Sequence, residues 1–166
     1  MRRYLPALAF IAACTTEVTD TGQLVGFEDR MFAECEDAGS FTCGVRVSVT
    51  DGQVVAVGMT NQGATQSTST TGTLNEAALV QLDDMIARIP MSTPDTIQES
   101  GCGLAPVRST TLDVSFDVHG LRHFDVVYAE NGAMAELNRF VLDLTSEIRL
   151  CNSTHMTFDA CQPNSR

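Results

Sequence analysis

The residues of this sequence that are able to perform covalent, acid–base or metal chemistry include six cysteines and three histidines. In an oxidising compartment cysteines form disulfides, whereas elsewhere a thiolate binds metals or acts as a nucleophile. The chemistry open to these residues therefore depends on where the protein resides. They are Cys14, Cys35, Cys43, Cys102, Cys151, Cys161, His119, His123 and His155.

Residues 1–13 have the pattern of a secretory signal. Arg2 and Arg3 are followed by the apolar run YLPALAFIAA, which ends in small residues. This order of a charged, an apolar and a small-residue region is typical of signal peptides. The apolar run is about half the ~20 residues that a transmembrane helix needs. We therefore expect residues 1–13 to be a cleaved signal peptide rather than a permanent membrane span.

The residues Ile11-Ala12-Ala13-Cys14 resemble the lipobox of bacterial lipoprotein precursors, with a branched apolar residue, two small residues and a cysteine. The resemblance covers about residues 1–16. It implies that the Cys14 thiol receives a diacylglyceryl group, that cleavage precedes Cys14, and that the new amine is acylated. Several acyl chains make such anchoring stable. Thr15 after the cysteine implies the outer membrane of the cell envelope. The alternative is an ordinary signal peptide with an incidental cysteine, since short motifs also occur by chance.

The chain that remains after residue 13 is strongly acidic. It has 8 Arg, no Lys and 21 acidic residues, which gives a net charge of −13 at pH 7 with neutral histidines. Such a charge repels nucleic acid and anionic lipid headgroups, so we expect neither as a partner. Contact with a membrane is expected only through the lipid, and the protein partner would be another envelope component.

The five cysteines beyond the lipobox are expected to form disulfides, because export places them in an oxidising compartment. Short spacing favours Cys35–Cys43 and Cys151–Cys161 and leaves Cys102 unpaired. Sequence does not fix connectivity, and Cys102–Cys151 is an alternative for the second pair.

Two other uses of these cysteines are weaker. Zinc ligation by Cys151, His155 and Cys161, with Cys102 as fourth ligand, has a spacing that matches no standard zinc finger. Cys102 also lies between two glycines, where a nucleophile would be accessible. A nucleophile needs a base within hydrogen-bond reach, and nothing local ties a histidine to Cys102.

Alternation of apolar and polar residues predicts two β-hairpins. In the first, a three-residue loop, Thr50–Gly52, pairs Val47 with Val55 and places most valines of both arms on one face. A two-residue turn at Asp51-Gly52 is the alternative, and it would pair Val47 with Ala56.

The second hairpin is predicted with a three-residue loop at Val118–Gly120, which pairs Val114 with Phe124. Its polar face would then place Asp113 opposite Asp125, with His123 nearby. Opposed carboxylates are unfavourable unless a cation lies close, so this patch is a weak candidate for calcium or zinc. A solvated outer face is the simpler interpretation in so acidic a protein.

An amphipathic helix is predicted after each hairpin. The first begins at the capping-box pattern Thr73-x-x-Glu76 and ends at Pro90, and the second covers about Ala133–Leu150. The segment TQSTSTTGTL before the first helix is predicted as an extra strand. The apolar stripes are Leu79, Leu82, Ile86 and Ile89 in the first helix, and Leu137, Phe140, Val141, Leu144 and Ile148 in the second.

The predicted fold is α+β: an antiparallel sheet built from two β-hairpin–helix units, about 41–90 and 108–150, with two helices packed on one face. Residues 14–26 are expected to be a flexible tether and 27–166 a single domain. The spacing of Phe27, Met31 and Cys35 predicts a short helix. This globular part resembles bacterial lipoproteins of uncharacterised activity that have a cysteine-flanked hairpin before a final helix.

No dinucleotide, P-loop, metalloprotease or serine-hydrolase motif is present in the sequence. We therefore assign no catalytic residue and no cofactor. The expected function is a lipid-anchored, non-enzymatic binding or structural module of the cell envelope. The alternatives are a small envelope hydrolase or thiol enzyme that uses Cys102 or the Asp113/His123/Asp125 patch, and a weak divalent-metal binder at that patch.

Overall fold

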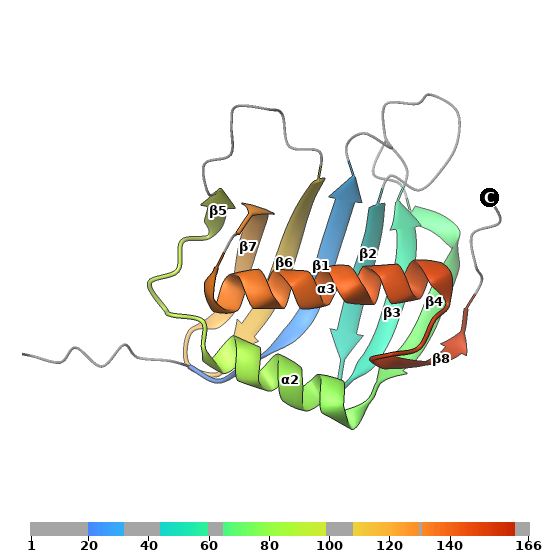
Figure 1. Ribbon diagram of the computed structural model, residues 1–166, viewed down its shortest axis with the longest axis horizontal. Helices are drawn as coiled ribbons and strands as arrows, with labels where there is room; N and C mark the ends of the chain where they lie inside the picture. The colour runs from blue at the N-terminus through green and yellow to red at the C-terminus, as the bar shows by residue number, and fades with distance from the viewer. Residues whose placement is uncertain (1–19, 32–43, 60–64, 99–107, 130, 162–166) are drawn as a thin grey trace, which may run out of the picture.

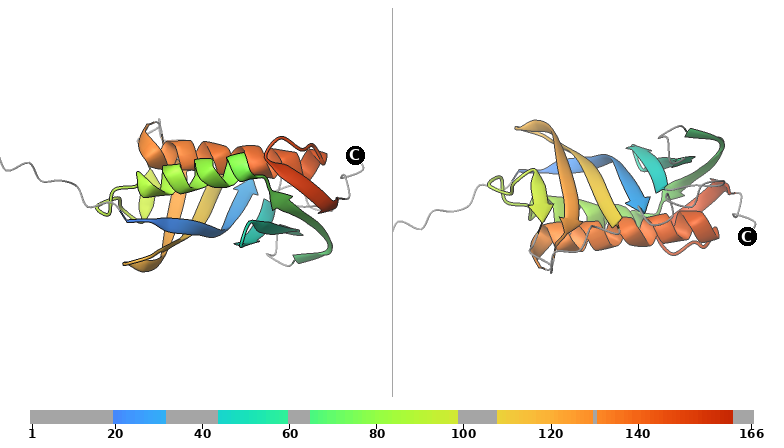
Figure 2. Two further views of the ribbon diagram at one scale, coloured as in Figure 1. Left: turned by 90° about the horizontal axis from the view of Figure 1, so that it is seen from below. Right: turned by 90° about the horizontal axis from the view of Figure 1, so that it is seen from above.

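Two helices lie across one face of an eight-stranded, mostly antiparallel sheet (Figure 1). The computed structural model describes residues 20–31, 44–59, 65–98, 108–129 and 131–161. Both edge-on views in Figure 2 place the two helices on the same side of the strands, so no helix of the described residues covers the opposite face of the sheet. The α+β class is therefore confirmed.

The strand order is β5-β7-β6-β1-β2-β3-β4-β8, and only β5 and β7 run parallel. The strands are β1 Gly22–Met31, β2 Gly44–Thr50, β3 Gln53–Met59, β4 Thr65–Leu74, β5 Thr96–Gln98, β6 Arg108–Phe116, β7 Gly120–Tyr128 and β8 Met156–Ala160. The helices are α2 Glu76–Ala87 and α3 Gly132–Leu150. The predicted extra strand is β4, whereas β5 and β8 were not predicted.

Strand β1 replaces two elements that the sequence predicts differently. Residues 22–26 were expected in the tether and 27–35 in a short helix, but Gly22–Met31 form a strand between β2 and β6. A spacing of four residues fits one face of a strand as well as one face of a helix, so the apolar pattern was ambiguous. Tertiary pairing decides the outcome, because β1 joins the two halves of the sheet.

The first hairpin has the two-residue turn, so the predicted three-residue loop is wrong. Thr50 pairs with Gln53 and Val47 with Ala56. Asp51 and Gly52 both have positive φ, 49° and 78°, as a type I′ turn requires. The preference of Asp-Gly for this turn outweighs the exposure of one valine, Val55, whose side chain is 46% exposed.

The second hairpin has a three-residue loop, but its position differs by one residue from the prediction. Phe116 pairs with Gly120 and Val114 with Arg122, so the loop is 117–119. The register shifts by two residues, which leaves the buried face unchanged. Residues 20 and 21 bind this loop through backbone and side-chain hydrogen bonds, a tertiary cause that the local sequence does not show.

Helix α2 begins later than the predicted capping box. Asn75 is the N-cap, and its side-chain oxygen accepts a hydrogen bond of 2.9 Å from the N–H of Ala78. Thr73, the predicted cap, belongs to β4 and pairs with Gln53 and Thr157. The second helix follows the prediction closely. All five residues of its predicted apolar stripe are buried.

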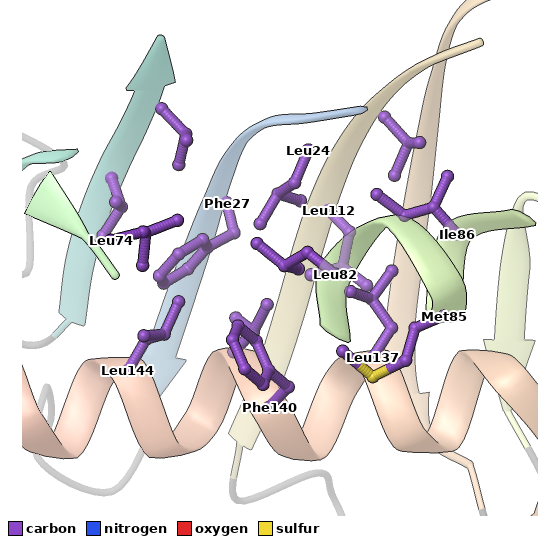
Figure 3. Packing of buried hydrophobic residues seen from close by; sticks show 14 of the residues in the cluster. Leu24, Phe27, Leu74, Leu82, Met85, Ile86, Leu112, Leu137, Phe140 and Leu144 are labelled. Atoms are coloured by element: carbon purple, nitrogen blue, oxygen red, sulfur yellow. The ribbon is translucent and has the colours of Figure 1, made fainter. Parts of the chain in front are cut away.

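The core lies between the sheet and the two helices. Figure 3 shows Phe27 of β1 pointing toward α3, where Phe140 and Leu144 lie. Leu82 of α2 packs into the same cluster, and α2 contacts both β1 and α3. Removing one such buried leucine side chain costs about 2–5 kcal/mol, so these contacts fix the position of α3 over the sheet.

The chain turns back sharply at the end of α3. Cys151 adopts φ 50° as the C-cap, and the chain then pairs β8 with β4. A disulfide joins Cys151 to Cys161, with Cα atoms 5.8 Å apart. This is the pair that short spacing favours, and the alternative Cys102–Cys151 pairing is not formed.

Candidate functional site

The predicted acidic patch has a different arrangement from the one expected. The shifted register places Asp113 opposite His123, with Asp113 Oδ1 2.6 Å from His123 Nδ1. Asp125 lies opposite Thr111 and accepts a hydrogen bond of 2.9 Å from its hydroxyl. The predicted opposition of Asp113 and Asp125 is therefore wrong. Each carboxylate has its own hydrogen-bonding partner, and the two carboxylates are no longer directly opposed.

The cysteines separate into two sets. Cys151 and Cys161 form a disulfide, so the zinc alternative that used their thiolates is wrong. Cys14, Cys35, Cys43 and Cys102 lie outside the described residues. Within the described parts of the chain, no group of three or more His, Cys, Asp or Glu residues is placed to hold a metal ion.

Each of the three histidines contacts a carboxylate through Nδ1. The pairs are His119–Asp20 at 2.8 Å, His123–Asp113 at 2.6 Å and His155–Glu147 at 2.5 Å. The third pair has a structural role. Glu147 also accepts hydrogen bonds from the backbone N–H groups of Thr154 and His155, which fixes the chain where it turns back after α3. In each of these pairs the contact occupies Nδ1 of the histidine ring.

Asp20 anchors the start of the described chain to the β6–β7 loop. Its carboxylate accepts hydrogen bonds from the backbone N–H groups of Val118 and His119 at 3.0 and 3.1 Å. Burial opposes ionisation of Asp20, but the hydrogen bonds from the His119 side chain and from these N–H groups outweigh it. The pKa of Asp20 is therefore lower than its ordinary value. The start of the domain is thus fixed at the Phe116 end of β6.

A crevice of about 310 Å³ opens between α3 and two strand ends, the start of β6 at Arg108 and the end of β7 at Val126 and Val127. In Figure 1 these strands extend past α3 on the side away from α2. Its polar lining is Arg108 and Thr110 of β6 with Asn138 and Arg139 of α3, and its apolar lining includes Val126, Ala135 and Leu142. A volume near 300 Å³ is at the small end of the range for ligand pockets.

Arg108 is held at one wall of the crevice by a buried carboxylate. Its guanidinium donates two hydrogen bonds of 2.6 Å to Asp29. Asp29 is fully buried and lies near the C-terminal end of β1. Asp29 lies opposite Thr110 in the sheet, which places the carboxylate under the crevice. A bidentate contact fixes both the position and the plane of the guanidinium.

Asn138 gives the crevice an unsatisfied polar group. Its side-chain oxygen is buried and has no hydrogen-bond partner among the residues that the structure describes. A buried acceptor without a partner costs about 1–3 kcal/mol, so such groups are rare in folded proteins. Asn138 is also one of the residues that line the crevice.

Two arginine side chains line the crevice of this acidic protein, and one of them, Arg108, is paired with Asp29. Arg108 and Arg139 line it, and among the described lining residues there is no Asp or Glu. Glu136, one turn away, is held by Arg88 at 2.6 Å. The Arg88 hydrogen bond and charge, with a smaller contribution from Arg139, lower the pKa of Glu136. Glu136 therefore interacts mainly with Arg88 and more weakly with Arg139.

A second, smaller hollow lies on the uncovered face of the sheet. It measures about 180 Å³ and includes Gly26, Glu28, Arg46 and Asp113. The register of β1 against β6 is irregular between Leu24 and Gly26, and a Cβ on Gly26 would lie 2.9 Å from the Val47 carbonyl oxygen. Arg46 binds Glu28 at 3.0 Å across this hollow. Its charged groups therefore satisfy one another, unlike the amide in the crevice.

The sequence did not indicate the residues of the crevice. Arg108 and Asp29 are 79 positions apart, and only the pairing of β1 with β6 brings them together. Asn138 and Arg139 lie beside the apolar stripe of α3 and look like ordinary surface residues in the sequence. A polar pair next to a predicted core stripe was the only local signal.

The described residues thus define an α+β protein with a crevice that two arginines line. No protein-family model, curated protein or solved structure shows a significant match to this chain. Neither α2 nor α3 in the described part of the chain has the length and apolar character needed to cross a bilayer.

Proposed function

We propose that this protein is a bacterial envelope lipoprotein, anchored through lipid on Cys14, whose domain is a non-enzymatic binding module. The lipobox-like residues Ile11–Cys14 support the anchor. The binding role rests on a single observation: the buried side-chain oxygen of Asn138 has no partner and lies at a crevice of ligand size.

The position of the crevice suits an anchored protein. Asp20 lies at the Phe116 end of β6, whereas Arg108 lies at the other end. With a rise of ~3.3 Å per residue, these ends are roughly 26 Å apart. The six steps from Cys14 to Asp20 span at most about 22 Å. The anchor and the crevice thus belong to opposite ends of the domain, which leaves the crevice facing away from the membrane.

We also propose that the sheet consists of two hairpin–helix units on either side of β1. The hairpin β2–β3 is followed by β4 and α2, and the hairpin β6–β7 is followed by α3. Each hairpin pairs with β1 through its first strand, β2 or β6. This arrangement gives both units the same relation to the central strand.

Metabolic labelling tests the anchor. Cells that produce the full-length protein are fed radioactive palmitate, and the wild type is compared with Cys14→Ala and with Cys102→Ala. We expect label in the wild type and in Cys102→Ala, and no label in Cys14→Ala. Equal labelling of the wild type and Cys14→Ala would refute lipid attachment at this residue.

A further inference from the structure

We propose that the crevice between α3 and strands β6 and β7 binds a small organic carboxylate that also carries an N–H group. The carboxylate would lie at Arg139, the N–H would donate to the Asn138 amide oxygen, and a short apolar body would fill the remainder. This inference rests on the proposed binding role of the crevice, and it adds the chemical class of the ligand.

The preference for an anion follows from the local charge. The mature chain carries −13, yet two of its 8 Arg line this crevice; Asp29 beneath the crevice balances the charge of Arg108, so the charge offered to a ligand is that of Arg139. At physiological salt the Debye length is about 8 Å, so the distant acidic groups are largely screened within the crevice. Guanidinium groups match carboxylates in shape and hydrogen-bonding pattern. An anion is therefore favoured locally although the protein as a whole is acidic.

The need for an N–H group follows from Asn138. The buried oxygen is an acceptor without a donor. The terminal torsion of asparagine is soft, so the amide can rotate toward the crevice at little cost. A ligand that lacks a donor would leave this oxygen unsatisfied. Satisfying a buried acceptor favours the matching ligand over one without the N–H.

The size and the apolar lining limit the body of the ligand. A crevice of about 310 Å³ accommodates a group of amino-acid size, and Val126, Ala135 and Leu142 offer a branched aliphatic surface. Arg108 is fixed by its two hydrogen bonds to Asp29, so this wall is preorganised before binding. The probe that meets these conditions is N-acetyl-leucine.

Titration calorimetry on the full-length lipidated protein in neutral detergent tests the ligand class. We expect N-acetyl-leucine to bind with a millimolar dissociation constant, as is usual for so small a ligand. N-acetyl-leucinamide lacks the charge, and 4-methylpentanoate lacks the N–H. Each is expected to bind roughly tenfold more weakly. Absence of saturable binding by N-acetyl-leucine at millimolar concentrations would overturn the proposal.

Matched variants locate the binding. Arg139→Gln and Asn138→Ala are each expected to weaken N-acetyl-leucine roughly tenfold, whereas Arg46→Gln on the uncovered face leaves it unchanged. Equal binding by all three variants would overturn the assignment to the crevice. If N-acetyl-leucinamide binds as tightly as the acid and binding still depends on Asn138, the anion preference is wrong while the crevice remains a binding site. Palmitate labelling is measured separately, so failure of the anchor is distinguishable from either result.

Discussion

Asp29 is a charged residue in the interior of the sheet, and its only described ion-pair partner is Arg108. Its side chain is fully buried, whereas the side chain of Arg108 is 36% exposed. A buried carboxylate is tolerated when it is paired and hydrogen-bonded, and it becomes costly when the partner is removed. The pair therefore contributes to the position of Arg108 at the crevice as well as to stability.

We predict that Arg108→Met lowers the free energy of unfolding by about 3 kcal/mol, because it leaves Asp29 buried without a cation. Arg46→Met removes an exposed partner of Glu28 and should cost at most about 1 kcal/mol. Urea unfolding at pH 7 measures both changes. The double variant Asp29→Leu/Arg108→Met should recover part of the loss, and a single-variant loss no larger than that of Arg46→Met would contradict this account of the pair.

Asp20 makes the stability of the protein depend on pH in the acidic range. Because its pKa is lower in the folded protein than in the unfolded chain, ionised Asp20 stabilises the fold above a pH of about 3.9. This contribution is lost as the pH falls through the folded-state pKa. We predict that the stability advantage of the wild type over Asp20→Asn shrinks below about pH 4.

Unfolding free energies measured across this pH range check the prediction for Asp20. Asp83→Asn serves as the control, since Asp83 is exposed on α2, whereas Asp20 is buried and accepts hydrogen bonds from the β6–β7 loop. The wild-type and Asp83→Asn curves should remain nearly parallel. A constant difference between the wild type and Asp20→Asn down to low pH would show that its ionisation does not contribute.

At the residue scale, the sequence predicted the identity of the Cys151–Cys161 pair but not the partners of the charged groups. A disulfide within eleven residues is a local event, and spacing is informative about it. The contacts Asp29–Arg108 and Asp20–His119 join positions far apart in the chain. Charge and residue type alone do not indicate which distant groups meet.

The secondary-structure elements differ in how well their sequences predict them. Helix α3 has a sustained apolar stripe, and its predicted span, about Ala133–Leu150, matches the observed Gly132–Leu150 closely. Strand β1 has a spacing that fits both a helix and a strand, and it exists as a strand because β2 and β6 pair with it. The register of the first hairpin depended on Asp51 and Gly52, whose turn preference outweighed the hydrophobic pattern.

We predict that Asn75→Ala destabilises the protein by about 1 kcal/mol, because it removes the N-cap of α2. The same side chain donates to the Thr154 carbonyl oxygen at 2.9 Å, so its loss also loosens the return after α3. Thr73→Ala should cost less than about 0.5 kcal/mol, since Thr73 is exposed and caps no helix. Thermal and urea unfolding of the two variants test this order, and a larger loss for Thr73→Ala would restore the capping-box prediction.

At the scale of the whole molecule, one sheet integrates segments from both ends of the described chain. Strand β1 lies at its centre and β8 at one edge. The α+β class and the placement of both helices on one face were predictable, because amphipathic helices must cover the apolar face of the sheet. The central position of β1 and the edge strands β5 and β8 were not, since short strands acquire their structure from their neighbours.

The proposed function unites these features: a lipid at Cys14 anchors one end of the domain, and the crevice with Arg108, Asn138 and Arg139 opens at the other. The central claim is that the mature chain begins at a lipid-modified Cys14. Intact-mass and peptide mass spectrometry of the protein purified from bacterial membranes measure it directly. We predict a chain that begins at Cys14, with a diacylglyceryl group on its sulfur and an acyl group on its amine. An unmodified cysteine, or a chain that begins elsewhere, would contradict the account.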